Sequence, residues 1–207
     1  MKKFFFLSIL FLLFFISGYS QKDLKFGIKG GINLSEMRSN EFQNKEGHTG
    51  YHLGALVSFP LAGRFSLETG LGYSTQGGTA EFSNEVGKTR AEMDLDYLQL
   101  PVMIKILVVP KLSINAGTYL NFLVHEEIGA EHTSPFLYSF LPIDPTEIQY
   151  DTNDLEVNAA LGLNYELSSR FCLYTTFVQG VTNAVEFGEG SVKARNRTYQ
   201  VGIGYRF

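Results

Sequence analysis

The sequence has one cysteine, Cys172, among its 207 residues. A single thiol excludes an intramolecular disulfide and a metal site built from several thiolates, so the fold must close without covalent cross-links. The formal net charge of −4 argues against a nucleic-acid partner, because such partners favour a basic stripe. Past residue 20 no apolar run approaches the roughly 20 residues that a membrane helix needs. Any crossing of a membrane by the rest of the chain therefore falls to strands.

The N-terminus has the form of a secretory signal peptide. A basic start at residues 2–3 precedes an apolar run at 4–16, and small residues at 17–20 supply a cleavage site. We expect cleavage near Ser20, which leaves 21–207 as one mature domain. A retained anchor helix is the alternative, but the apolar run is short and polar residues follow it at once. No cysteine lies near the cleavage point, so a lipid-anchored start is not supported.

Alternation of apolar and polar residues with period two recurs along the mature chain, whereas helix-period patterns are scarce. Eight segments carry the alternation, with bulky apolar residues on one face and mainly glycine, amide or hydroxyl residues on the other. Their approximate bounds are 25–35, 49–60, 65–76, 97–106, 112–123, 154–165, 171–177 and 199–207. Pro101 has no backbone N–H to donate, so we expect a local bulge in the fourth segment.

The connections between these segments alternate in length. Short connections fall at about 61–64, 109–111 and 167–170, and long ones at about 36–48, 77–92, 124–153 and 180–196. Outer-membrane barrels have this arrangement, with their short turns in the periplasm. The sequence therefore predicts an all-β fold, an eight-stranded antiparallel transmembrane β-barrel preceded by a signal peptide, with both mature termini on the periplasmic side.

Three features favour lipid over water outside the barrel. The polar faces carry few charges, which suits a narrow lumen, whereas a water-facing surface is about a quarter or more charged. Each apolar face spans about 9–11 residues, the length that a tilted strand needs to cross the hydrocarbon. Aromatic residues fall at two heights, as in the girdles of membrane barrels. The expected periplasmic girdle is Phe26, Phe59, Phe65, Tyr165, Phe171, Tyr205 and Phe207, and the outer one is Tyr51, Tyr73, Phe122, Phe177 and Tyr199.

The runs 26–33 (FGIKGGIN), 97–101 (YLQLP) and 202–207 (GIGYRF) resemble the bacterial outer-membrane β-barrel domain family often labelled porin-family or PorT-like. The resemblance covers essentially all of the mature chain. It implies a location in the outer membrane of a Gram-negative cell, with lipid as a partner. Phe207 resembles the terminal aromatic by which the barrel-assembly machinery recognises its clients, which implies that machinery as a second partner. The family label does not show that the barrel conducts anything.

Charges of both signs fall on the expected inner face. They are Lys29, Glu68, Lys105 and Arg206, with Glu166 near the periplasmic mouth. Unpaired charges in a lumen of low dielectric would be costly, so we expect an ion-paired, hydrogen-bonded plug and not an open pore. A structural role is favoured for these residues because narrow barrels fill with side chains.

The histidines could support an enzyme, because a histidine–carboxylate pair can act as a general base. His125, next to Glu126 and Glu127, and His132 lie on the longest expected loop, and His48 and His52 lie near the same rim. No nucleophile elbow, metal-binding histidine spacing or phosphate-binding glycine motif accompanies them. We interpret the loop histidines as solvated and assign no catalytic, cofactor or metal residue.

The expected loop 124–153 has six carboxylates and no lysine or arginine, together with the apolar run 136–143. Long loops are often functional, and Phe136, Tyr138 and Phe140 could anchor a partner or pack over the barrel mouth. Our hypothesis is a protein-partner or calcium contact at this loop, and the alternative is a loop folded across the opening.

These observations favour a non-enzymatic scaffold, adhesion or secretion-accessory role that acts through the outer loops. A narrow porin-like channel for small solutes is the second hypothesis. An outer-membrane lipid-modifying enzyme and a soluble lipocalin-like carrier are further alternatives, because alternation by itself does not separate lipid-facing from water-facing barrels. A lumen filled with side chains would favour the first hypothesis over a channel. A pre-organised base with a nucleophile would identify an enzyme.

Overall fold

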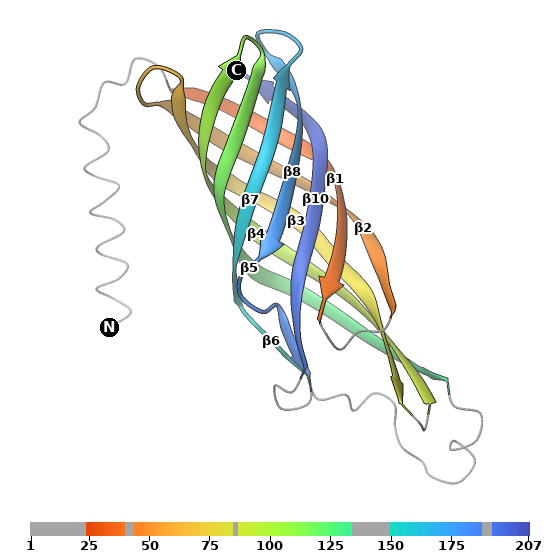
Figure 1. Ribbon diagram of the computed structural model, residues 1–207. Helices are drawn as coiled ribbons and strands as arrows, with labels where there is room; N and C mark the ends of the chain where they lie inside the picture. The colour runs from red at the N-terminus through yellow and green to blue at the C-terminus, as the bar shows by residue number, and fades with distance from the viewer. Residues whose placement is uncertain (1–23, 40–43, 85–86, 134–149, 188–191) are drawn as a thin grey trace, which may run out of the picture.

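The computed structural model describes residues 24–39, 44–84, 87–133, 150–187 and 192–207, which form an antiparallel β-barrel (Figure 1). No helix in these ranges is long and apolar enough to cross a membrane. The described strands are β1 (Lys25–Arg38), β2 (Asn44–Pro60), β3 (Phe65–Asn84), β4 (Gly87–Val109), β5 (Leu112–Thr133), β6 (Tyr150–Thr152), β7 (Leu155–Glu166), β8 (Phe171–Gly180), β9 (Val185–Phe187) and β10 (Val192–Arg206). Eight of them, β1 to β5, β7, β8 and β10, form the wall in that order, and pairing of β1 with β10 closes it. The predicted eight-stranded barrel is confirmed.

Tight turns join neighbouring strands at one end of the barrel, as predicted. Residues 61–64 join β2 to β3, residues 110–111 join β4 to β5, and residues 167–170 join β7 to β8. Gly63 has a φ of 58°, a left-handed conformation that glycine adopts at little cost. β1 begins and β10 ends at this same end, which we call the short-turn end. Short turns of outer-membrane barrels lie in the periplasm, so the short-turn end faces the periplasm.

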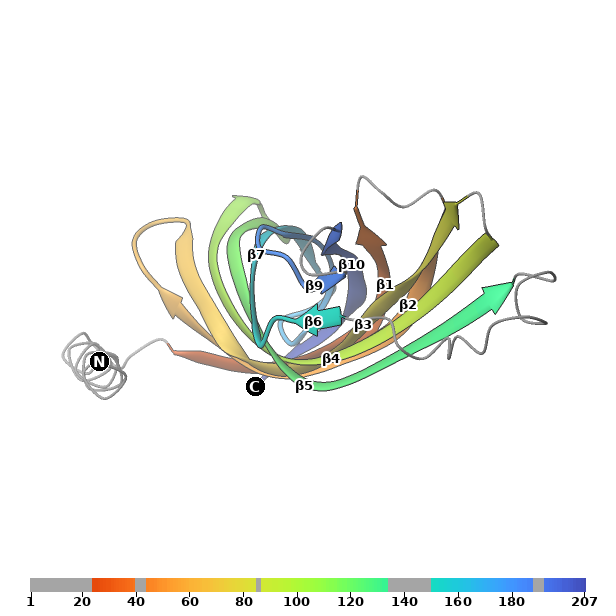
Figure 2. The ribbon, with the colours of Figure 1, turned by 90° about the horizontal axis from the view of Figure 1, so that it is seen from below.

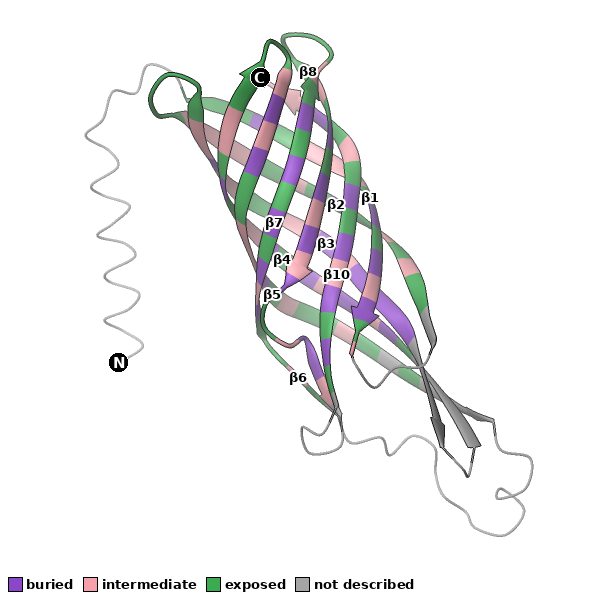
Figure 3. Ribbon diagram, in the orientation of Figure 1, coloured by how far each residue is buried: buried purple, intermediate pink, exposed green. Residues whose placement is uncertain are grey.

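The barrel wall has apolar side chains on its outer face and polar side chains on its inner face, the reverse of a water-soluble protein. Burial alternates residue by residue along β7, and Figure 3 shows the same alternation along the other strands. The exposed positions are apolar, since Leu161 exposes 56% of its surface, whereas the inward Asn158 exposes 1%. Apolar surface of this extent is stable in hydrocarbon and unfavourable in water. The outer face of the barrel is therefore the lipid-contacting face.

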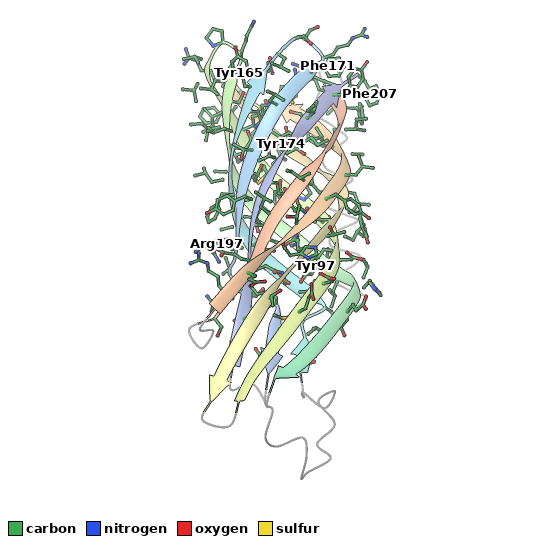
Figure 4. All side chains as sticks on the ribbon, turned by 90° about the vertical axis from the view of Figure 1, so that its right-hand side faces the viewer. Tyr97, Tyr165, Phe171, Tyr174, Arg197 and Phe207 are labelled. Carbon is green, nitrogen blue, oxygen red and sulfur yellow. The ribbon has the colours of Figure 1, made fainter. Side chains whose placement is uncertain are left out.

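Aromatic rings pack in pairs at the two predicted heights. At the short-turn end the ring centroids of Tyr205 lie 5.1 Å from Phe171 and 5.3 Å from Phe207. Figure 4 shows Tyr165, Phe171 and Phe207 together at this end. At the other level Tyr51 pairs with Tyr73 at 6.0 Å, and Phe177 pairs with Tyr199 at 5.0 Å. The two levels mark the interfaces between hydrocarbon and water.

The prediction of four long loops is wrong in part, because strand structure continues into them. The expected loop 77–92 is a hairpin in which β3 and β4 stay paired as far as Asn84 and Gly87. β5 continues to Thr133 and takes in the first part of the expected loop 124–153. Continued pairing satisfies backbone groups that a loop would leave to water.

A change in the phase of the alternation hid these extensions in the sequence. In β4 the apolar side chain of Leu98 points outward, but the apolar side chains of Met93 and Leu95, earlier in the same strand, are fully buried. β10 changes in the same way between Arg197 and the exposed Tyr199. A wall that faces water places apolar residues inside, the reverse of a wall that faces lipid. In sequence such a change within one strand resembles a strand end.

The longest strands extend well past the bilayer. β3, β4 and β5 have 20, 23 and 22 residues, whereas a strand needs about 9–11 to cross the hydrocarbon. About half of each strand therefore lies beyond the outer ring of aromatic side chains. We call this part the outer extension; it consists of the described residues in 36–50, 75–96, 124–133, 150–154 and 181–197.

A small second sheet completes the outer extension. β9 pairs with β6 and with residues 192–194 of β10. Figure 2, seen from this end, shows β6 and β9 lying across the barrel in front of the other strands. Backbone hydrogen bonds hold the junction, because Asn153 N donates to Ala184 O at 2.9 Å and Leu123 N donates to Asp154 O at 2.9 Å. This sheet was not predicted.

The prediction of a bulge at Pro101 is also wrong. The register of β4 against β5 shifts at Asp96/Tyr97 and again at Leu107/Val109, but not at Pro101. Pairing with β3 is instead interrupted around Pro101 without a change of register. Thr69 Oγ1 donates to Pro101 O at 2.7 Å, which ties the two strands together at the gap.

A charge on the lipid face tests the assignment of the two faces. Leu161 lies at the middle of β7 and points outward, so Leu161→Arg should lower the free energy of unfolding by about 2–4 kcal/mol. Leu167→Arg is the control, because Leu167 is equally exposed but lies in a turn at the short-turn end, where the cost is about 0–1 kcal/mol. Denaturant unfolding in phospholipid vesicles measures both. Equal costs would contradict a lipid-facing wall.

Candidate functional site

The candidate site is the barrel lumen, into which the inward positions of the wall strands point. Its buried side chains are mostly polar, unlike the core of a soluble domain. Three groups of polar side chains lie along the barrel axis, and we call them the ionic layer, the histidine layer and the glutamate layer. Figure 4 shows Tyr174 of the histidine layer nearer the short-turn end and Tyr97 of the glutamate layer nearer the outer extension.

The ionic layer contains all five charged residues predicted for the lumen. Lys29 Nζ donates to Glu68 Oε1, and Lys105 Nζ lies 3.9 Å from Glu68 Oε2. Arg206 Nη2 donates to Glu166 Oε1 at 3.0 Å. These residues come from five different strands and line one cavity at the short-turn end. The structure thus brings the predicted residues together as two ion-paired groups.

The histidine layer crosses the lumen next to the ionic layer. His52 Nδ1 lies 2.7 Å from Asn33 Oδ1, and His52 Nε2 contacts the Tyr174 hydroxyl. Since Asn33 Oδ1 is an acceptor, Nδ1 carries the proton and Nε2 accepts from Tyr174. Asn33 Nδ2 donates to Ser74 Oγ at 2.8 Å, and Lys29 Nζ lies 5.1 Å from the centroid of the Tyr174 ring. His52, expected near the rim, is therefore a bonded lumen residue.

The glutamate layer was missed by the sequence analysis. Glu156 Oε1 accepts from the Tyr97 hydroxyl and from Asn196 Nδ2 at 2.9 Å, and Glu156 Oε2 lies 3.2 Å from the same nitrogen. All three residues expose 1% of their surface or less. Within the described ranges no ion pair to Glu156 is found. The alternation of inward and outward positions in β7 could have identified Glu156 as a lumen residue. Tyr97 lies where the apolar residues change face, so the sequence did not indicate its position.

A group of buried apolar side chains lies next to the glutamate layer, inside the outer extension. We call it the outer seal, and its members are Met37, Met93, Leu95, Tyr97, Ala184, Val185 and Ala194. None exposes more than 1% of its surface, and Leu123 packs against them. An apolar constriction excludes water and ions by dewetting. Among the described residues, apolar packing therefore closes the lumen at its outer end.

The histidines do not assemble a hydrolytic centre in the described part of the chain. His125 and His132 lie in β5 and not in a loop, which corrects the prediction; pairing with β4 orders the backbone there. His48 Nδ1 lies 3.0 Å from Asp94 Oδ1. No side-chain hydrogen bond from a histidine to a serine or cysteine is found among these residues. The same ranges contain no group of three or more His, Cys, Asp or Glu side chains placed to hold a metal ion.

The remaining predicted residues fall in two places. Phe136, Tyr138 and Phe140 lie outside the described residues. Phe207 is at the short-turn end, where its backbone N donates to Phe26 O at 3.0 Å and its ring, 75% of the residue being exposed, packs against Tyr205. A terminal aromatic at this position is accessible from the periplasmic side.

The chain belongs to the outer membrane protein β-barrel domain family, whose model matches residues 19–186. The protein is therefore an outer-membrane β-barrel protein, and this excludes the soluble-carrier alternative. Its predicted location in the cell outer membrane is confirmed. The signal peptide and its cleavage near Ser20 stay predictions, because residues 1–23 lie outside the described ranges.

Solved structures are similar to the chain at low sequence identity. Neisserial surface protein A (NspA) is 10% identical with a TM-score of 0.52, over 90% of this chain and 100% of that chain. OprG from Pseudomonas aeruginosa is 12% identical with a TM-score of 0.47, over 88% of this chain and 95% of that chain. Ail from Yersinia pestis is 12% identical with a TM-score of 0.45, over 88% and 98%. No curated protein sequence matches the chain.

The ionic layer makes a stability prediction. Glu68→Gln removes the carboxylate that Lys29 and Lys105 share, so the free energy of unfolding should fall by about 3–5 kcal/mol, the usual cost of leaving a buried charge unpaired. The control is Glu36→Gln in the more exposed pair with Arg38, which should cost less than about 1 kcal/mol. Equilibrium unfolding in lipid vesicles measures both variants, and similar losses would contradict the role of Glu68.

Proposed function

We propose that this protein is a closed, non-enzymatic outer-membrane barrel that holds the outer extension above the bilayer as a contact surface for a partner. This is a scaffold, adhesion or secretion-accessory role. The observation that carries the proposal is the outer seal, because a barrel without an open path acts through what it presents and not through what it conducts. The proposal does not name the partner.

The side chains in the lumen support a closed barrel over a channel. A solute that entered from the periplasm would meet the paired charges of the ionic layer, then the hydrogen bonds of the histidine and glutamate layers, and then the outer seal. Each polar layer is largely satisfied internally, so opening it would expose unpaired buried groups at a cost of several kcal/mol. A narrow porin-like channel is therefore the weaker candidate.

The outer extension has the surface of a rigid, water-exposed platform. Charged side chains lie on the outer surface beyond the outer aromatic ring. Glu36 pairs with Arg38 of the same strand at 2.7 Å and with Arg197 of the neighbouring strand β10 at 3.7 Å. Arg197 also lies 5.6 Å from the centroid of the Phe177 ring, at the level of the aromatic ring (Figure 4). Paired strands lose little further entropy when a partner binds, which favours recognition by this surface.

Two finer parts of the proposal concern the predicted loop 124–153 and Phe207. A protein or calcium contact at the predicted loop 124–153 now concerns residues 134–149 and the aromatic trio Phe136, Tyr138 and Phe140. Recognition of Phe207 by the barrel-assembly machinery is likewise proposed, supported by its exposure at the short-turn end. The non-enzymatic character is supported by the absence, within the described ranges, of a histidine side chain bonded to a serine or cysteine side chain.

Conductance tests the closed lumen. The wild-type protein in a planar bilayer should show no stable open state, because the outer seal excludes water. The double variant Met93→Ser, Leu95→Ser places hydroxyl groups in the seal and should produce measurable ion current. The control is Leu98→Ser, which changes an outward residue of the same strand. A large, stable open state in the wild-type protein would rule out the proposal.

Shortening the β3–β4 hairpin tests the contact surface. Residues 80–91 can be replaced by Asn-Gly, a two-residue turn that suits the paired strands at Thr79 and Glu92. The barrel should still fold, as judged by heat-modifiable mobility on gels, while partner cross-linking on intact cells is lost. Arg64→Ala, at the short-turn end, is the control and should keep the cross-links. Equal cross-linking in both variants would contradict a role for this hairpin.

A further inference from the structure

The cavity at the short-turn end is lined by an excess of positive charge. Five basic and two acidic residues line it, an excess of three positive charges. The basic residues are Lys25, Lys29, Lys105, Arg170 and Arg206, and the acidic ones are Glu68 and Glu166. The cavity opens to solvent at the short-turn end. The chain as a whole is acidic, so this concentration of cations is local.

The two carboxylates of the cavity already have cationic partners. Glu166 bonds to Arg206, and Glu68 bonds to Lys29, which leaves Lys105 Nζ at 3.9 Å from Glu68 Oε2, beyond hydrogen-bond distance. Among the described residues no hydrogen bond to Lys105 Nζ is found. Its side chain is only 13% exposed. A largely buried ammonium group without a close acceptor is unfavourable, and a bound anion would supply the missing acceptor.

The cavity is open at one end and closed at the other. The exposed turn residues 168–170 form its rim at the short-turn end. On the far side, Tyr174 covers Lys29 and bonds to His52, so the histidine layer closes the path. An anion can therefore enter from the periplasm and stay, but it cannot pass through the barrel. This arrangement is that of a binding site and not of a conduit.

We propose that this cavity binds a small oxyanion, of the phosphate or sulfate type, from the periplasmic side. Lys105 contributes the inner charge, and Lys25 and Arg170 contribute the charges at the rim. Ammonium and guanidinium groups bind such oxygens through charge-assisted hydrogen bonds, and the low dielectric of the lumen strengthens the attraction. The site is independent of the outer extension, so it can be correct whether or not that surface binds a partner.

Calorimetry of the folded full-length protein in detergent tests the proposal. Sodium phosphate and sodium sulfate should each bind saturably at one site, whereas sodium chloride at equal ionic strength should not. Lys105→Gln should weaken the binding by about tenfold, because it removes a largely buried charge at the site. The control is Lys193→Gln, which makes the same change at an exposed lysine of the outer extension and should leave binding unchanged.

Two further measurements keep the test decisive. Arg170→Gln alters an exposed turn residue and should also weaken binding, which covers the case in which Lys105→Gln does not fold. The single cysteine, Cys172, lines the same cavity, so phosphate should slow its modification by an anionic thiol reagent in the wild-type protein. The proposal is overturned if no saturable binding appears up to about 10 mM. Equal affinities in Lys105→Gln, Arg170→Gln and Lys193→Gln would overturn it as well.

Discussion

The structure depends on closure of the backbone hydrogen-bond ladder between β1 and β10. Inside hydrocarbon there is no water for an unpaired N–H or C=O, so a sheet with two free edges is not stable there. Pairing from Gly27 with Arg206 to Arg38 with Arg195 removes both edges. Closure also creates a lumen narrow enough to be filled by side chains. The layers of polar contacts and the apolar outer face both follow from this single constraint.

Alternation predicted much of the transmembrane part, because one residue per two-residue repeat must face lipid. It placed Lys29, Glu68 and Lys105 on the inner face, where the structure has them. It failed beyond the aromatic ring, since there the solvent changes from lipid to water and the apolar positions move to the other face. The partners of Glu156 were also beyond reach. Contacts across the lumen depend on strand tilt and stagger, which a period-two pattern does not specify.

Polar contacts close the lumen near one end, and apolar packing closes it near the other. The ionic layer, near the periplasmic side, uses paired charges whose cost is offset by hydrogen bonds. The outer seal uses Met37, Met93 and Leu95, which need no partners and are fully buried. The barrel therefore has a charged, solvent-accessible end and an apolar, buried end. The asymmetry separates a surface directed outward from a cavity directed inward.

The phase change in the strands also specifies a hydrophobic thickness. In β4 it falls at Leu98, and in β10 it falls between Arg197 and Tyr199, so the boundary of the acyl region is set residue by residue around the barrel. A bilayer thicker or thinner than this belt would force local stretching or compression of the surrounding lipid, at a modest energy per ångström. The barrel is thereby matched to membranes of one thickness and would concentrate in regions that have it.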